Sequence, residues 1–181
     1  MQAGGGSVEI DKDLVNRARN KDPEAFAKLY GLICEDLFHF AIYMLGNKQD
    51  AEDVVSETVM SAFSQIEKLR KPEAFRSWMF QILVNQCKRK RKEYTWQTVP
   101  IEDDYFEPAP DREEICDLHR ALGFLEEEER AVVLLSAVGG YSSREIGDYM
   151  QMNANTVRTR RVKAFNKLRT LLEGGEREAV L

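Results

Sequence analysis

Apolar residues recur at intervals of three and four along most of this chain, and this spacing restricts its fold more than any other feature. An α-helix turns once in about 3.6 residues, so such spacing gathers apolar side chains on one face. Alternating apolar and polar runs, which are typical of half-buried strands, do not reach a useful length. We therefore predict an all-α fold. The clearest stripe consists of Phe26, Leu29, Tyr30, Ile33, Leu37, Phe40, Ala41 and Leu45.

Start and stop signals divide the first half of the chain into three helices. Asp22 followed by Pro23 is typical of a helix start, and Gly46-Asn47 is typical of a helix end. The spacing predicts one continuous helix between these signals and a second helix from about 50 to 66. After a loop at 69–72, a third helix is predicted to begin near Glu73 and to lead into a basic run.

The second half of the chain contains a predicted helix-turn-helix. A helix starts near Arg112, and four glutamates at 126–129 open the next one, because negative charge favours the N-terminal end of a helix. Ser142 and Glu145 form a capping box that predicts a short helix after it. A turn at 151–153 then leads into a basic helix that is expected to reach about Glu173.

Charge is distributed unevenly along the 181 residues, whose formal net charge is −5. Two stretches, 74–92 and 149–172, contain no acidic residue, and each contains six bases. A polyanion such as nucleic acid is the usual reason for concentrating positive charge in an acidic chain, although one basic helix face can also serve solubility alone. The bases are Arg76, Lys88, Arg89, Lys90, Arg91 and Lys92 in the first stretch, and Arg158, Arg160, Arg161, Lys163, Lys167 and Arg169 in the second.

An acidic segment with several prolines separates the two basic stretches. Residues 96–112 contain five acids, one base and three of the five prolines, which is typical of an extended linker. We therefore predict two helical domains joined by this acidic, proline-containing linker. The expected boundaries are a flexible leader at 1–10, a first domain at 11–95, the linker at 96–112, a second domain at 113–175 and a tail at 176–181.

The last helix has two different faces. Helical geometry places Val157, Ala164, Leu168 and Leu171 on a packed face, and the opposite face carries Arg158, Thr159, Val162, Lys163 and Asn166. Polar residues near the N-terminus of such a helix are suited to contacting base edges in a major groove. Arg160 and Arg161 lie nearer the packed face, so that phosphate contacts or structural pairing suit them better. The alternative is that this helix does not bind DNA and is an ordinary basic amphipathic helix of a helical bundle.

Motifs in both halves resemble one family. The residues at 50–58, DAEDVVSET, and at 75–85, FRSWMFQILVN, resemble region 2 of bacterial sigma factors. The residues at 141–147, YSSREIG, and at 155–160, NTVRTR, resemble region 4. Because no other region lies between them, the chain resembles the extracytoplasmic-function group of the sigma-70 family over about residues 10–173.

This resemblance implies that the chain binds core RNA polymerase and promoter DNA and helps to open the DNA for transcription initiation. The implied core-binding residues are Asp50, Asp53, Ser56 and Glu57. The loop at 67–72 and the helix after it would engage the −10 element, including an unstacked base, with Arg76, Asn85, Lys88, Arg89, Lys90, Arg91 and Lys92. The −35 element would be bound by Arg158, Thr159, Val162 and Lys163, with Arg160 and Arg161 beside them.

The resemblance also implies an anti-sigma factor as a partner and a cytoplasmic location. No arrangement of residues typical of a catalytic site is present, so an enzyme is not expected, and neither is a cofactor. Three widely spaced cysteines predict reduced thiols in a cytosolic protein. Two histidines cannot supply a convincing metal site, and packing or surface roles are expected for Cys116 and His119 rather than metal binding. No apolar run is long enough to span a membrane.

Two other functions are consistent with parts of the pattern. A stand-alone helix-turn-helix regulator would use the last helix alone and would bind DNA without polymerase. A helical interaction protein would direct its basic strips toward acidic proteins and would show no sequence preference on DNA. Within the resemblance to sigma factors, Gln151 occupies the turn position where glycine is common, and a left-handed backbone there would strain glutamine.

Overall fold

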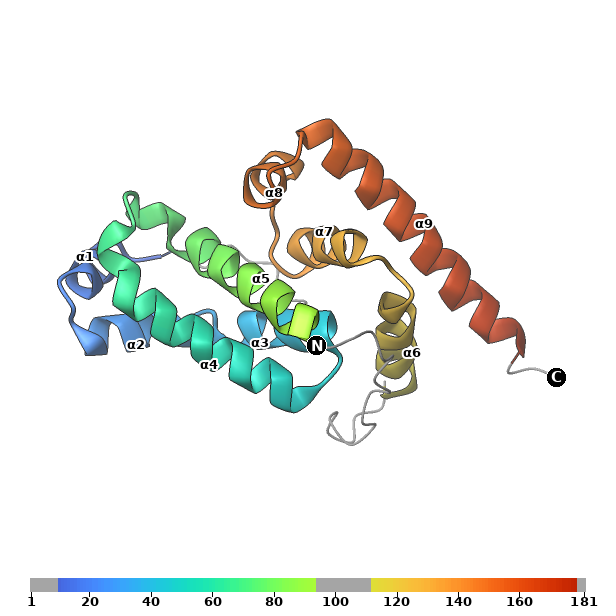
Figure 1. Cartoon of the computed structure of the whole chain (residues 1–181), viewed down its shortest axis with the longest axis horizontal. Helices are drawn as coiled ribbons and strands as arrows, with labels where there is room; N and C mark the ends of the chain where they lie inside the picture. The colour runs from blue at the N-terminus through green and yellow to red at the C-terminus, as the bar shows by residue number, and fades with distance from the viewer. Residues whose placement is uncertain (1–9, 94–111, 179–181) are drawn as a thin grey trace. The chain divides into compact units, whose positions relative to one another are not determined.

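The computed structural model describes residues 10–93 and 112–178, and these residues contain helices and no strand (Figure 1). The all-α prediction is therefore confirmed. The chain divides into two compact units, residues 1–41 with 49–95 and residues 42–48 with 96–181. Most of the predicted leader and linker, and the end of the predicted tail, lie outside the described residues.

Helices α1 to α5 belong mainly to the first unit, with two short 3-10 turns, η1 and η2, between α4 and α5. Their bounds are α1 Lys12–Arg19, α2 Pro23–Gly31, α3 Cys34–Leu45, α4 Lys48–Gln65, η1 Ile66–Lys68, η2 Pro72–Ala74 and α5 Phe75–Glu93. Asp22 caps α2 as predicted, because its Oδ1 accepts from the backbone N–H groups of Glu24 at 3.0 Å and Ala25 at 3.1 Å. Helix α1 was not predicted, since only Val15 and Ala18 of its eight residues are buried.

The continuous helix predicted from Pro23 to Leu45 is wrong, because α2 ends at Gly31 and α3 begins at Cys34. At the break, the N–H groups of Leu32 and Ile33 bond to carbonyls three residues back, at 3.3 and 2.9 Å. Glycine has a low helix propensity, which favours a break here. Ile33 is nevertheless only 1% exposed. The apolar spacing therefore continues across the break, although the helix itself does not.

Aromatic side chains from four helices form the core of the first unit. Phe40 of α3 and Phe80 of α5 pack edge to face with ring centroids 5.7 Å apart. Phe26 of α2 contacts Phe63 of α4 at 5.2 Å and Phe75 of α5 at 6.2 Å, also edge to face. These contacts fix α4 and α5 against a common core, and the two helices lie side by side (Figure 1). Ion pairs join their polar faces.

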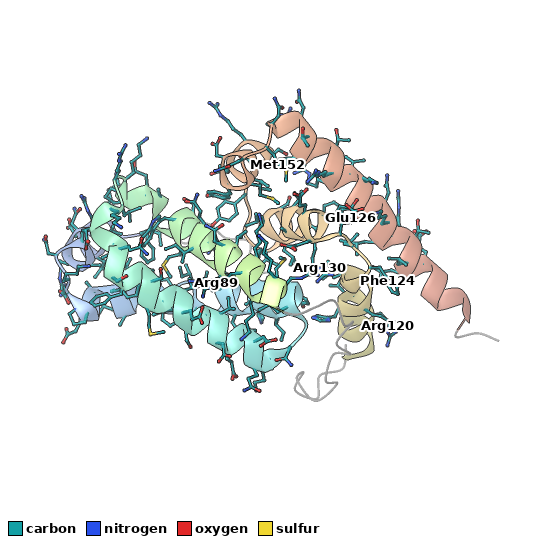
Figure 2. All side chains as sticks on the ribbon, in the orientation of Figure 1. Arg89, Arg120, Phe124, Glu126, Arg130 and Met152 are labelled. Atoms are coloured by element: carbon teal, nitrogen blue, oxygen red, sulfur yellow. The ribbon has the colours of Figure 1, made fainter. Side chains whose placement is uncertain are left out.

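The described part of the second unit consists of residues 42–48 together with helices α6 to α9. Their bounds are α6 Arg112–Gly123, α7 Glu127–Ala137, α8 Ser143–Met150 and α9 Ala154–Glu178. Arg130 of α7 is 7% exposed, and its guanidinium donates to the carbonyl oxygens of Leu122 at 2.8 Å, Gly123 at 3.0 Å and Leu125 at 3.3 Å (Figure 2). A buried guanidinium thus satisfies the carbonyl groups at the end of α6 and joins α6 to α7.

The turn between α8 and α9 completes the helix-turn-helix. The Ser142 capping box forms as predicted, with the backbone N–H of Ser142 donating to Glu145 Oε2 at 2.9 Å. Gln151 has a φ of 54°, the expected left-handed conformation. Met152 N–H donates to the Gly147 carbonyl at 2.8 Å, and a Cβ on Gly147 would lie 2.6 Å from the Met152 carbonyl oxygen. The turn therefore closes against a position that has room only for glycine.

Replacing Gly147 with alanine is expected to lower the free energy of unfolding by about 1–3 kcal/mol, because a backbone carbonyl must move to admit the methyl group. Urea denaturation followed by circular dichroism measures this loss. Gly123→Ala is the control in the same unit, since nothing lies within 4 Å of its added Cβ. Equal stabilities of the two variants would contradict the close approach at Gly147.

Candidate nucleic-acid interface

Helix α9 exposes the four residues that the sequence assigned to base contacts. Arg158, Thr159 and Lys163 are exposed, and Val162 is 58% exposed although it is apolar. Val157, Ala164 and Leu168 are buried as predicted, whereas Leu171 is 37% exposed. The prediction that Leu171 packs in the core is therefore wrong, because it lies at the edge of the apolar stripe. The outward face near the N-terminus of α9 is free of core packing.

Four bases of α9 contact α7, three of them at its first turn. Arg160 forms an ion pair with Glu128, and Arg161 Nη1 donates to Ser136 Oγ at 3.4 Å. Lys167 Nζ lies 2.6 Å from Glu129 Oε2, and Lys163 Nζ lies 3.5 Å from Glu129 Oε1. Structural pairing was one of the two roles predicted for Arg160 and Arg161, but the glutamate partners were missed, because the four glutamates were explained only by the helix dipole. A signal was present, since an acidic helix start and a basic helix face occur within one small domain.

Glu129 is the buried centre of this pairing, because its side chain is only 3% exposed. Burial raises the pKa of the Glu129 carboxyl. The hydrogen bonds from Lys167 and from the backbone N–H of Glu126, together with the charges of Lys167 and Lys163, lower the pKa by a larger amount. The net result is a lowered pKa, so that Glu129 is charged at neutral pH. Helix α9 is thereby fastened to α7 by a buried carboxylate.

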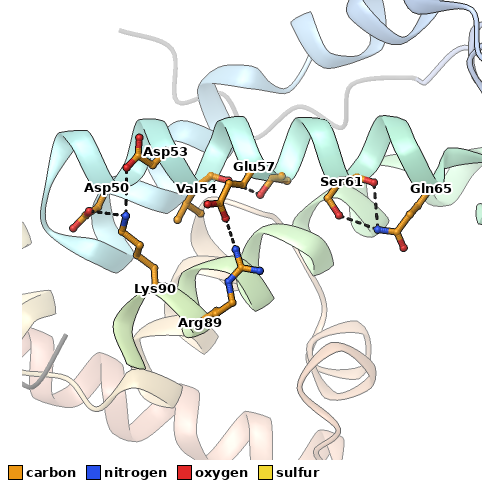
Figure 3. A network of polar contacts seen from close by, with 9 residues as sticks. Asp50, Asp53, Val54, Glu57, Ser61, Gln65, Arg89 and Lys90 are labelled. Atoms are coloured by element: carbon orange, nitrogen blue, oxygen red, sulfur yellow. Dashed lines mark hydrogen bonds and ion pairs between the residues drawn. The ribbon is translucent and has the colours of Figure 1, made fainter. Parts of the chain in front are cut away.

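Two of the bases on α5 face the acidic side of α4 (Figure 3). Lys90 Nζ lies 3.2 Å from Asp50 Oδ1 and 3.3 Å from Asp53 Oδ2. Arg89 forms an ion pair with Glu57. Desolvation lowers the pKa of Lys90, but the hydrogen bonds that it donates to Asp50 and Asp53, together with their charges, raise the pKa by more, so that the net shift is upward. The structure thus brings together two sets of residues that the sequence assigned to different partners.

The other predicted residues of α4 and α5 have varied surroundings. Arg76 is 2.8 Å from Asp36 Oδ2 and 5.3 Å above the Phe80 ring, which holds it within the first unit. The remaining side chains are grouped by exposure: Ser56, Asn85 and Lys92 are exposed, whereas Lys88 and Arg91 are half-buried. The first basic strip therefore does not present all of its charge outward.

The described residues offer little support for metal binding. Within 10–93 and 112–178, no group of three or more His, Cys, Asp or Glu side chains could hold a metal ion. His119 is 4% exposed, and burial lowers its pKa, while the Cys116 side chain lies outside the described residues. In the same ranges, no helix has both the length and the apolar character to cross a membrane.

Comparisons with known proteins match both units. Residues 29–97 match the family Sigma-70 region 2, and residues 117–168 match the family Sigma-70, region 4. The chain is 30% identical over 174 residues to the ECF RNA polymerase sigma factor SigM of Mycobacterium tuberculosis H37Rv, covering 93% of this chain and 88% of that protein. It is 29% identical over 141 residues to the RNA polymerase sigma factor SigV of Bacillus subtilis, covering 76% and 85%.

Solved structures share the arrangement of helices. CnrH, solved in complex with the cytosolic domain of CnrY, has a TM-score of 0.73 and 24% identity, covering 92% of this chain and 99% of CnrH. The sigma factor RpoE of Bartonella quintana, solved with the anti-sigma factor NepR, has a TM-score of 0.68 and 24% identity, covering 82% and 96%. Likeness at this level of identity establishes the fold.

Replacing Glu129 with glutamine is expected to lower the free energy of unfolding by about 1–3 kcal/mol, because two lysines lose a buried charged partner. The variant's loss in free energy of unfolding should be full above pH 4.5, the ordinary pKa of glutamate. This loss should shrink as the pH falls through the lowered pKa of Glu129 in the folded state, because the carboxylate of the original protein then becomes protonated. Urea denaturation at several pH values measures both effects. Glu127→Gln on the same turn is the control, and an equal loss there would contradict the special role of Glu129.

Proposed function

This chain belongs to the extracytoplasmic-function sigma factors of the sigma-70 family, and we propose from that membership which of its faces bind polymerase and promoter DNA. It is an RNA polymerase sigma factor. The observation that supports the assignment best is the match to both sigma regions, in order, over residues 29–97 and 117–168. A stand-alone regulator is disfavoured, because a protein that used only its helix-turn-helix would not explain why residues 29–97 match Sigma-70 region 2.

The acidic face of α4 is the proposed docking surface for core polymerase. Asp53 and Ser56 are exposed, whereas Asp50 and Glu57 are partly covered by the bases of α5. A basic surface on polymerase would compete with Lys90 and Arg89 for these carboxylates. Arg89 and Glu57 are 59% and 43% exposed, and an exposed ion pair contributes only about 0–1 kcal/mol, so exchange of this pair is energetically accessible. Lys90 and Asp50 are only 21% and 16% exposed, so their pair would open less easily. After docking, the side chains of Lys90 and Arg89 on α5 would be available to bind promoter DNA.

The two basic strips are the proposed promoter contacts. The 67–72 loop and α5 would bind the −10 element, with Asn85, Lys88, Arg91 and Lys92 among the contacts. Arg89 and Lys90 would join them after exchange. Arg76 would act mainly through its pair with Asp36. On α9, Arg158, Thr159, Val162 and Lys163 would contact the −35 element, while Arg160 and Arg161 would position the helix through their contacts with α7.

Three further properties are proposed from the family. The protein would act as a specificity subunit of polymerase without catalysing a reaction itself. It would act in the cytoplasm, where its polymerase is found. An anti-sigma factor would be a partner that keeps it from polymerase.

Run-off transcription from a pool of host genome fragments, with purified core polymerase, tests the proposed function. We expect discrete new transcripts that share two upstream elements, and only when both this protein and core polymerase are present. DNA selection with the protein alone is the companion experiment. Specific binding without polymerase, together with no new transcripts, would favour the stand-alone regulator instead.

Replacing Asp53 and Glu57 together with alanine is expected to weaken binding to core polymerase by about tenfold, or about 1.4 kcal/mol for two charge contacts. Fluorescence anisotropy of labelled protein titrated with core polymerase measures the dissociation constant. Glu24→Ala with Glu35→Ala is the matched control, since it removes two exposed acids from the same unit. Equal weakening in the control would show that net charge, and not the α4 face, governs docking.

Replacing Arg158 or Lys163 with alanine is expected to reduce transcription from a cognate promoter by about tenfold, as for the loss of one good base contact. The affinity for core polymerase should not change. Arg169→Ala removes the same charge from an exposed position farther along α9 and should have a smaller effect. An equal effect of all three substitutions would mean that α9 acts by its charge alone.

A further inference from the structure

Lys21 joins the turn between α1 and α2 to the end of α4. Its Nζ donates to the carbonyl oxygens of Phe63 at 3.1 Å and Ser64 at 2.8 Å. These carbonyls belong to the last turn of α4, where helix carbonyls lack partners within the helix. The same ammonium forms an ion pair with Glu67 and lies 5.8 Å from the centroid of the Phe63 ring.

The backbone of Lys21 is in a conformation that few side chains adopt. Its φ is 64°, in the left-handed region that glycine enters easily and a residue with a Cβ does not. A lysine at this position costs conformational energy that glycine would avoid. The side-chain contacts with α4 and Glu67 are the evident compensation, so the residue serves a purpose beyond forming the turn.

The segment that Lys21 contacts leads directly into the 67–72 loop. Ile66 is fully buried and Leu69 is 4% exposed, so apolar contacts anchor the start of the segment, while Arg70 and Lys71 are exposed. Glu67 also lines an open pocket of about 410 Å³ together with Asn16, Arg19 and Asn20 of the α1 end. Lys21 is therefore a polar link between this loop and the α1 end of the unit.

We propose that Lys21 is a positioning residue, which holds the 67–72 loop in the conformation that receives the unstacked base of the −10 element. This inference rests on the proposed function of the loop. A base taken out of its stack needs a site formed in advance, since small displacements of binding groups greatly reduce their effect. Lys21 acts through the last turn of α4 and the Glu67 side chain, and it does not itself contact DNA.

Lys21→Gly separates this role from stability, because glycine suits the backbone conformation while removing every side-chain contact. We expect urea denaturation to show no loss of stability and core polymerase affinity to stay unchanged. The preference for a cognate promoter over promoters altered singly within the −10 element should fall on the order of tenfold in run-off transcription. Lys21→Arg keeps the charge and the donors and should restore much of that preference.

Two sets of variants make each outcome decisive. Lys28→Ala removes one exposed positive charge from the same unit and should leave the preference unchanged. Arg70→Ala with Lys71→Ala tests the loop itself. If the loop variant loses −10 preference and Lys21→Gly keeps it, the inference about Lys21 is overturned alone. If neither variant loses it, the proposed function of the loop fails as well.

Discussion

Each basic strip of this protein is opposed by acids on a neighbouring helix of the same unit, and this opposition decides which bases face outward. The pairs are Lys90 with Asp50 and Asp53, Arg89 with Glu57, Arg160 with Glu128, and both Lys163 and Lys167 with Glu129. The charge available to DNA is therefore smaller than a count of bases indicates. A chain with a net charge of −5 then has little reason to bind DNA alone.

The two sets of pairs differ in how easily they can open. Arg89 and Glu57 are 59% and 43% exposed, so their pair contributes little stability and can be exchanged for another partner. Glu129 is 3% exposed, and opening its pair with Lys167 would leave a buried carboxylate without a partner. The exposed Arg89–Glu57 pair is thus suited to the change of partners that we propose for docking to polymerase, and the buried Glu129 holds rigidly the helix that we propose contacts the −35 element.

Backbone geometry at two turns supports these roles. Lys21 and Gln151 have positive φ values of 64° and 54°, which are unusual for residues other than glycine. Gln151 closes the turn before α9, where Gly147 leaves room for the chain to pass. Lys21 instead offsets its strain through contacts with the end of α4. In both places a local cost is tolerated because it fixes the start of a segment that we propose contacts DNA.

The sequence alone determined the all-α class, the helix-turn-helix and the outward face of α9. Helical period, capping boxes and turn residues act over a few positions, so they can be read without knowing the fold. The tertiary structure decided the break at Gly31, the exposure of Leu171 and the partners of Arg89, Lys90 and Arg160. The ion-pair partners are 32 to 40 positions away and meet these bases only when helices pack. The apolar period predicts which positions are buried, but it does not predict where a helix breaks or which residue lies opposite. The same reason hid Lys21, whose partners at Phe63 and Ser64 lie more than 40 residues along the chain.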